Sequence, residues 1–164
     1  MPILSNRAFG LAAALAAAAA LAIAHGSETW GGLIPCPLCL VERWPYRTAV
    51  FLGLAAAFLP SMVARAAVAL LTLTMLTGTV LAAIHVGVEF HWWPSPLPEC
   101  VAPSFGGGSI AERLARMPAV PAKPCDDPTY LIPGLPLSMA AMNLLFAAAF
   151  TAAGAWATIR SPRA

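Results

Sequence analysis

Residues 66–88, AAVALLTLTMLTGTVLAAIHVGV, contain no Asp, Glu, Lys or Arg. A helix needs roughly 20 mostly apolar residues to cross the about 30 Å of hydrocarbon in a bilayer. This stretch is long enough to do so. Because an open sheet edge cannot face lipid, the run predicts a transmembrane helix rather than strands.

Three further apolar stretches are also long enough to cross: residues 8–24, 38–59 and 135–159, the second of them broken near its start by Glu42, Arg43, Pro45 and Arg47. Together the four predict an all-α integral membrane fold, a bundle of four transmembrane helices with a long outer loop at residues 89–134. We expect one domain covering residues 1–164.

The first stretch has an alternative interpretation. Arg7, the apolar run and Ala22-Ile23-Ala24 are also typical of a cleavable signal peptide. The run is somewhat long for a signal peptide and the chain has other spans, so we expect it to be retained.

The composition agrees with a membrane protein. Of 164 residues, 60% are hydrophobic and 10% charged, and the mean hydropathy is +0.78. A soluble domain usually carries about 25% charged residues. The net charge of only +2 argues against a nucleic-acid partner, which needs a basic face.

Basic residues near the span ends predict the orientation. With four crossings, four arginines lie on one side: Arg7, Arg65, Arg160 and Arg163. The basic residues of the outer loop lie toward its middle and are balanced by acidic ones. The positive-inside rule therefore predicts cytoplasmic termini and an outward-facing loop.

All four cysteines, Cys36, Cys39, Cys100 and Cys125, are predicted on that outer side. Four cysteines allow three pairings, and the spacing of Cys36 and Cys39 favours a bond between them. They begin a predicted helix, whose N-terminus favours the thiolate form and makes a disulfide easier to reduce. We expect a redox pair. A structural disulfide, or half of a zinc site completed by histidines, remains open.

Cys100 and Cys125 bracket a loop rich in proline and glycine. A bond between them would constrain the loop by roughly 3.5 kcal/mol. A flexible loop suits a disulfide that exchanges with two partners, while a structural bridge is the alternative. Residues 109–117 predict a short amphipathic helix, lying either on the membrane surface or on the bundle.

Charged residues follow the first cysteine pair. On a helix Cys36, Cys39 and Arg43 share one face, and Arg47 continues it. An arginine here can donate hydrogen bonds to the carbonyl oxygens of an electron acceptor. Alternatively both arginines extend toward lipid headgroups, and Glu42 pairs with one of them.

Near the outer end of the third span, His85 and Glu89 are i, i+4 neighbours. A histidine there could relay protons to an acceptor that consumes them on reduction. A packing role is the alternative. His91, Trp92 and Trp93 are typical of an aromatic belt at the membrane interface.

The pattern resembles the DsbB family of bacterial disulfide-bond formation proteins. The resemblance rests on Cys36-Pro37-Leu38-Cys39-Leu40-Val41-Glu42-Arg43, on Trp93-Pro94-Ser95-Pro96 shortly before Cys100, and on Cys125 before the fourth span. It implies a four-helix enzyme of the bacterial inner membrane, with its cysteines facing the periplasm. Such an enzyme is a quinone-dependent protein thiol–disulfide oxidoreductase that reoxidises a periplasmic, DsbA-like thioredoxin-fold protein. Ubiquinone would be the usual acceptor, and menaquinone would serve when oxygen is short.

The resemblance also implies roles for the cysteines. The partner's thiol would attack Cys100 and form a mixed disulfide, Cys125 would be the resolving partner of Cys100 in the loop, and Cys39 would lie against the quinone with Arg43 beside it. The candidate quinone-binding residues are Arg43, Arg47, His85 and Glu42, and we expect no resident metal.

Two other functions remain open. A vitamin K epoxide reductase-like protein also links a membrane CxxC to a quinone, but its active pair lies near the last helices. A membrane metal-binding or transport subunit would carry polar residues along several spans. Here the first span has none, and the fourth offers only four: Ser138, Asn143, Thr151 and Thr158.

Overall fold

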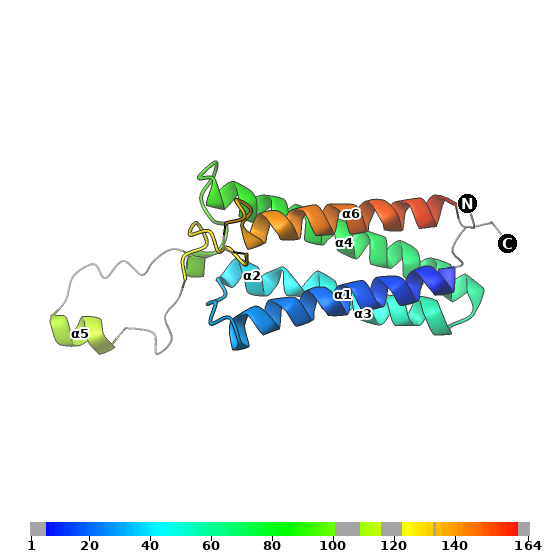
Figure 1. The fold of residues 1–164 in the computed structure, drawn as a ribbon, viewed down its shortest axis with the longest axis horizontal. Helices are drawn as coiled ribbons and strands as arrows, with labels where there is room; N and C mark the ends of the chain where they lie inside the picture. The colour runs from blue at the N-terminus through cyan, green and yellow to red at the C-terminus, as the bar shows by residue number, and fades with distance from the viewer. Residues whose placement is uncertain (1–5, 101–108, 116–122, 133, 161–164) are drawn as a thin grey trace.

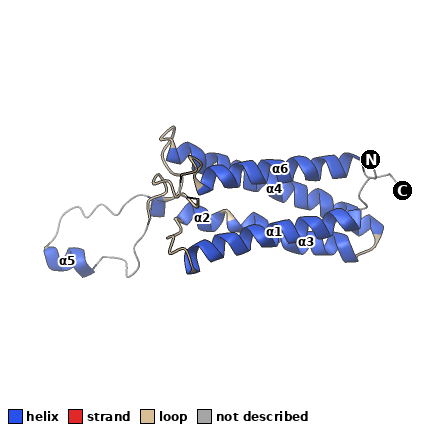
Figure 2. Ribbon diagram, in the orientation of Figure 1, coloured by secondary structure: helices blue, strands red, loops and turns tan. Residues whose placement is uncertain are grey.

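The computed structural model describes residues 6–100, 109–115, 123–132 and 134–160. This part of the chain is helical and contains no strand (Figure 2). The elements are α1 (Asn6–Thr29), α2 (Pro37–Val41), α3 (Arg43–Phe58), α4 (Ser61–Glu89), η1 (Pro98–Cys100), α5 (Ile110–Ala115) and α6 (Met139–Arg160). The predicted all-α class is confirmed.

The long helices lie side by side and alternate in direction (Figure 1). α1 packs against α3, α4 packs against α6, and contacts between α3 and α4 join the two pairs. The start of α1 and the end of α6 lie at one end of the bundle. α2 and the segments that follow α4 and precede α6 lie at the other end (Figure 1).

In the part of the chain that the structure describes, three helices are long and apolar enough to cross a membrane: α1, α4 and α6. The predicted span at residues 38–59 instead consists of α2 and the 16-residue α3, with Glu42 between them. Pro45 explains the interruption, because it has no N–H to donate to the carbonyl of Val41 one turn earlier. The fourth crossing therefore stays a prediction.

Small residues allow α1 and α3 to approach closely. A Cβ added at Gly10 would lie 2.7 Å from the carbonyl oxygen of Gly53, and one added at Gly53 would lie 2.9 Å from the backbone nitrogen of Ala14. Close backbone packing at small residues is the usual way in which helices associate in lipid. The glycines here set the distance between the helices.

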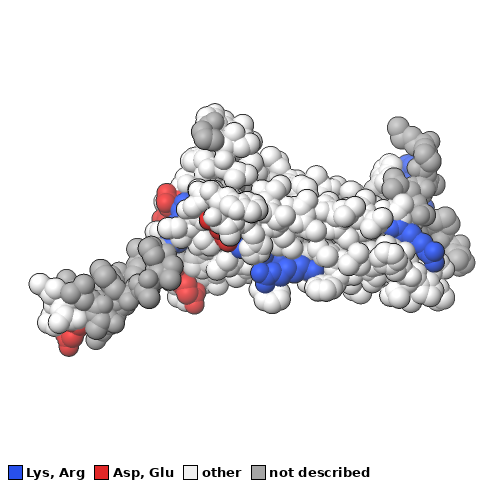
Figure 3. Space-filling model, turned by 60° about the horizontal axis from the view of Figure 1, so that its bottom comes forward, with Lys and Arg blue, Asp and Glu red and all other residues white. Residues whose placement is uncertain are grey.

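Many large apolar side chains lie on the outer surface. Large side chains such as Phe51 and Phe58 are 73% and 75% exposed. On the face in Figure 3, most of the bundle's surface is uncharged and acidic side chains gather toward the end that carries α2. Such a surface is unusual for a soluble monomer and suits contact with lipid.

The predicted helix at residues 109–117 is found as α5, whose start is capped by Ser109 and Glu112. Met117, part of that prediction, lies outside the described residues. α5 stands apart from the bundle in Figure 1.

Candidate redox site

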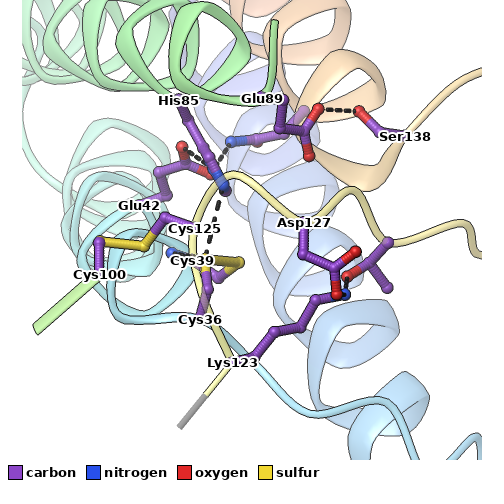
Figure 4. Close-up of a disulfide and its surroundings, with 12 residues drawn as sticks. Cys36, Cys39, Glu42, His85, Glu89, Cys100, Lys123, Cys125, Asp127 and Ser138 are labelled. Carbon is purple, nitrogen blue, oxygen red and sulfur yellow. Dashed lines mark hydrogen bonds and ion pairs between the residues drawn. A yellow bond between two sulfur atoms is a disulfide. The ribbon is translucent and has the colours of Figure 1, made fainter. Parts of the chain in front are cut away.

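Two disulfides lie at the α2 end of the bundle. One joins Cys36 to Cys39 and the other joins Cys100 to Cys125, with Cα–Cα distances of 5.1 and 5.0 Å. We call them the helix-start pair and the loop pair. They form one buried cluster with three apolar side chains: Leu38, Val88 and Leu97. Figure 4 shows the two disulfides close together.

The sequence around the helix-start pair folds as the proline predicts. Cys36 is the N-cap of α2 with extended backbone, and Pro37 occupies the first turn, where its missing N–H leaves nothing unpaired. The backbone N–H of Cys39 donates a hydrogen bond to Cys36 Sγ at 3.1 Å. This donor would stabilise negative charge on that sulfur once the disulfide is opened.

The loop pair lies outside the long helices but is not exposed. Cys100 ends η1 and is 4% exposed, while Cys125 is 1% exposed. The backbone N–H of Cys125 donates to the carbonyl of Cys100 at 3.4 Å. The sequence suggested a flexible loop, but in the described part both cysteines are packed against the helix-start pair.

Trp93 attaches the segment after α4 to the helix itself. Its Nε1 donates to the carbonyl of Ile84 at 3.0 Å. A Cβ added at Gly87 would lie 2.0 Å from the Trp93 ring, so the ring occupies the space that glycine leaves. Trp93 was predicted only as part of an interfacial belt. It also fixes where the chain leaves α4 toward Cys100.

A chain of hydrogen bonds runs inward from the helix-start pair, and we call its five residues the polar chain. His85 Nε2 lies 3.5 Å from Cys36 Sγ, and His85 Nδ1 lies 2.9 Å from Glu42 Oε1. Asn143 Nδ2 donates to Glu42 Oε2 at 2.7 Å. Tyr46 donates its hydroxyl proton to Asn143 Oδ1 at 2.5 Å. The polar chain thus connects α2, α3, α4 and α6.

His85 lies between the carboxylate of Glu42 and the helix-start pair. One ring nitrogen, Nδ1, faces Glu42, and the other, Nε2, faces Cys36 Sγ (Figure 4). Histidine can both donate and accept a proton. The ring is therefore placed to exchange a proton with the Cys36 sulfur once the disulfide has been opened.

Arg43 and Arg47 lie in different surroundings. Arg43 is buried and forms an ion pair with Glu28 of α1, with His25 Nδ1 3.4 Å from one of its nitrogens. Arg47 is half-buried and its guanidinium lies 5.0 Å from the centre of the Trp44 ring. Glu42 bonds to His85 and Asn143 rather than to an arginine.

A cavity of about 450 Å³ opens beside the helix-start pair. Most of its wall is apolar, and half of its lining residues come from α1 and α6. Five predicted site residues line it: Cys36, Cys39, Glu42, Arg43 and His85. Arg47 is not among its lining residues. The cavity therefore has an apolar body with a charged, sulfur-containing wall.

Glu89 also lines the cavity, and its carboxylate accepts a hydrogen bond from Ser138 at 2.5 Å (Figure 4). The sequence placed Glu89 beside His85 but gave no partner for it. Ser138 comes from the start of the chain's last helical segment.

Sequence reasoning did not assign three polar residues of the site: Glu28, Tyr46 and Asn143. Asn143 had a usable signal, because an amide in an otherwise apolar span must find a partner and usually marks a site. Glu28 had none, since its helix was predicted to end before it. α1 continues to Thr29, and this extension brings Glu28 to Arg43.

The described residues also contain one group with the chemistry of a metal site. The sulfurs of Cys36 and Cys39 and a ring nitrogen of His85 lie within 4.8 Å of one another.

The chain is similar in sequence to known disulfide bond formation proteins. The family model described as disulfide bond formation protein DsbB matches residues 6–157. The chain is 31% identical over 87 residues to disulfide bond formation protein B of Herminiimonas arsenicoxydans. That match covers 53% of this chain and 55% of the relative, so it spans about half of each. No solved structure matches the chain.

Proposed function

This chain belongs to the DsbB family of disulfide bond formation proteins, and on that premise we propose a complete electron path for it. The loop pair takes two electrons from a soluble, thioredoxin-fold dithiol protein of the DsbA type. The helix-start pair receives them next, and a membrane quinone is the final acceptor. The chain's activity would then sustain disulfide formation outside the cytoplasm.

One observation carries this proposal: the helix-start pair has a different neighbour on each side. On one side it packs against the loop pair. On the other it lines the apolar cavity, together with Arg43 and His85. A disulfide between a second disulfide and a ligand-sized cavity suits a relay more than a structural bridge.

The first exchange occurs at the loop pair. A thiolate of the partner attacks Cys100 Sγ, a bond forms between these sulfurs, and Cys125 leaves as a thiolate. The partner's second thiol then attacks its own sulfur in the mixed disulfide and releases Cys100. The partner leaves oxidised and the loop pair is left as two thiols. Because both cysteines are buried, the partner must displace part of their cover.

The second exchange occurs between the two pairs. A thiolate of the loop pair attacks the helix-start disulfide, and the second loop thiol completes the transfer. The loop pair is oxidised again and the helix-start pair is reduced. His85 Nε2, 3.5 Å from Cys36 Sγ, takes up or returns the proton of that thiol.

The cavity has the volume and lining that a quinone ring requires. Ligand pockets usually measure roughly 300–1,000 Å³ with mostly apolar walls and a few oriented polar groups, and this one measures about 450 Å³. A quinone accepts two electrons and two protons and so restores the disulfide. Cys39 and Arg43 would hold its ring, with the guanidinium donating to a carbonyl oxygen. We propose ubiquinone, with menaquinone as the alternative.

The membrane placement is part of the same proposal. α2 and α3 together would make the fourth crossing beside α1, α4 and α6. The termini would lie in the cytoplasm and both pairs would face the periplasm, as the basic residues at the span ends predict. The soluble partner would then meet the loop pair in the periplasm.

A thiol count tests the electron path. The purified chain is fully reduced, freed of reductant, and mixed with a short-chain ubiquinone under anaerobic conditions. We expect four thiols to disappear as two equivalents of quinone are reduced. If oxidised quinone removed no thiols, the quinone step would be rejected.

Arg43 and Arg47 provide a matched pair for the same assay. Among the described residues, Arg43 is the arginine that lines the cavity. We therefore expect Arg43→Met to raise the quinone KM at least about tenfold, the effect of a lost charged hydrogen bond. Arg47→Met should change it less than twofold. Equal effects of the two substitutions would contradict this placement of the quinone.

A further inference from the structure

The three atoms Cys36 Sγ, Cys39 Sγ and His85 Nε2 form a compact donor set. They lie within 4.8 Å of one another and come from the start of α2 and from α4. Cys36 and His85 are buried, at 3% and 3% exposure. Two thiolates and one imidazole are ligands that Zn²⁺ and similar thiophilic cations prefer.

The distance between the sulfur and nitrogen donors fits such an ion. In tetrahedral zinc sites the Zn–S bond is about 2.3 Å and the Zn–N bond about 2.0–2.1 Å, which puts sulfur and nitrogen ligands roughly 3.5 Å apart. His85 Nε2 lies 3.5 Å from Cys36 Sγ. The two sulfurs are bonded to each other in this structure, so the set becomes available only after reduction.

The surroundings of the donors have the features that orient metal ligands. A metal-binding histidine usually donates its other ring N–H to a carboxylate, and His85 Nδ1 has Glu42 Oε1 at 2.9 Å. Asn143 holds the second oxygen of that carboxylate at 2.7 Å. The N–H of Cys39 already donates to Cys36 Sγ, which would stabilise a bound thiolate. The other ring nitrogen, Nε2, faces the sulfur of Cys36.

We propose that the reduced helix-start pair and His85 bind one Zn²⁺ or a similar thiophilic divalent cation, with a water from the cavity as fourth ligand. The ion displaces two protons from the two thiols and changes no oxidation state, so no other reactant is needed. A metal-bound pair has no free thiolate to pass electrons onward. Such ions would therefore arrest the chain reversibly in its reduced state.

The surroundings of the loop pair differ in the metal-binding side chains that they offer. Within the residues that the structure describes, no histidine, carboxylate or further cysteine completes a comparable set around Cys100 and Cys125. Metal binding should therefore distinguish the two pairs, although both supply two sulfurs.

Cobalt titration of the full-length, chemically reduced protein tests the site. Only the arrest of turnover rests on the proposed function, because a chemical reductant replaces the partner and no quinone is added. We expect one Co²⁺ per chain, with sulfur-to-cobalt charge-transfer absorption and the visible bands of a tetrahedral ion. Zn²⁺ should displace it, and oxidised protein should show neither absorption.

Variants locate the ligands. The double variant Cys100→Ser, Cys125→Ser should keep the cobalt spectrum, while Cys36→Ser should lose its charge-transfer band. His85→Ala should weaken binding at least tenfold. His91→Ala is the matched control, because His91 is exposed with a side chain 72% accessible, and it should bind as the unchanged chain does.

Two results would overturn the proposal. One is a cobalt affinity that His85→Ala leaves unchanged. The other comes from X-ray absorption of the zinc-loaded, unmutated chain, which does not depend on any variant folding. Two sulfur ligands with at least one nitrogen are expected, and a shell of four sulfurs would assign the metal to both pairs instead.

Discussion

The helix-start pair and the loop pair are similar in Cα separation but different in what surrounds them. The helix-start pair begins a helix, receives a backbone N–H and contacts His85. The loop pair contacts mainly apolar side chains, and the backbone N–H of Cys125 donates to the carbonyl of Cys100. Its position depends on the segment that Trp93 fixes to α4.

This difference separates two tasks that one disulfide could not combine. A pair that meets a soluble protein must be able to leave its cover, and a pair at a short irregular segment can move without breaking a long helix. A pair that passes electrons into the bundle needs fixed neighbours, and the polar chain connects it to α3, α4 and α6. Their contact in one cluster lets electrons cross from one to the other.

The largest expected effect comes from breaking each pair separately. Cys39→Ser and the double variant Cys100→Ser, Cys125→Ser should each reduce steady-state partner oxidation by at least about a thousandfold, as expected when a reacting group is removed. Single-turnover experiments should separate them. The Cys39→Ser chain should still oxidise one equivalent of partner, and the loop variant should oxidise none.

Alkylation of free thiols followed by gel electrophoresis measures both variants. In the loop variant, quinone should still oxidise Cys36 and Cys39. If that variant oxidised the partner at the normal rate, the division of tasks between the pairs would be wrong.

A smaller effect is expected when the polar chain loses its charge. Glu42→Gln leaves one oxygen where two donors, from His85 and Asn143, now find two. The His85 ring then loses the carboxylate that orients it, so turnover should fall about tenfold to a hundredfold, part of the usual contribution of proton transfer. The loss can be measured as the rate at which the helix-start pair is reduced in a stopped-flow experiment.

Glu42 would act by positioning His85, and a purely structural role must be distinguished. The dependence of the rate on pH should flatten in Glu42→Gln and return with Glu42→Asp. Glu112→Gln in exposed α5 is the control and should change nothing. If Glu42→Gln and Glu42→Asp lowered the thermal stability equally and left the pH profile of the rate unaltered, Glu42 would be a structural residue only.

Much of the fold could be predicted from the lengths of the hydrophobic stretches. Much of the site could be predicted from the spacing of a few reactive residues. The CxxC at a helix start, Glu42 and Arg43 are close in sequence, so a helical repeat is enough to bring them together. Arg47 shows where this fails: it continues the same face, but its guanidinium bends onto Trp44. A periodic pattern predicts the direction of the Cα–Cβ bond, but it does not predict where the end of a long side chain lies.

Contacts between helices could not be predicted this way. His85 was expected near the outer end of its span, but its partners Glu42 and Cys36 depend on how α4 packs against α2 and α3. The Glu28–Arg43 pair depends on α1 running past its apolar residues to Thr29. These positions depend on packing between helices, which an isolated segment does not encode.

A change at Gly87 should affect the loop pair alone. Gly87→Ala puts a methyl group into the space of the Trp93 ring, and overpacking of this kind usually costs about 1–3 kcal/mol. The segment leading to Cys100 should shift, so electron transfer between the pairs should slow about threefold to tenfold. Oxidation of the helix-start pair by quinone should keep its rate.

The matched control is Ala83→Ser, an exposed position one turn away on α4. Rapid mixing of reduced partner with the oxidised chain, followed by acid quenching, gives the transfer rate. Slower quinone oxidation in Gly87→Ala would mean that the two pairs are not independent.

The smallest effect should come from the far end of the polar chain. Tyr46→Phe removes one hydroxyl, whose bond to Asn143 contributes about 1 kcal/mol. The ring remains stacked near Phe146, with centroids 6.1 Å apart, so no cavity forms. Asn143 keeps its bond to Glu42 but loses the partner that fixes its amide plane. Turnover should therefore fall only about twofold to threefold, and Tyr130→Phe, 51% exposed, should have no effect. A loss as large as that of Glu42→Gln would instead make the Tyr46 hydroxyl itself part of the proton path.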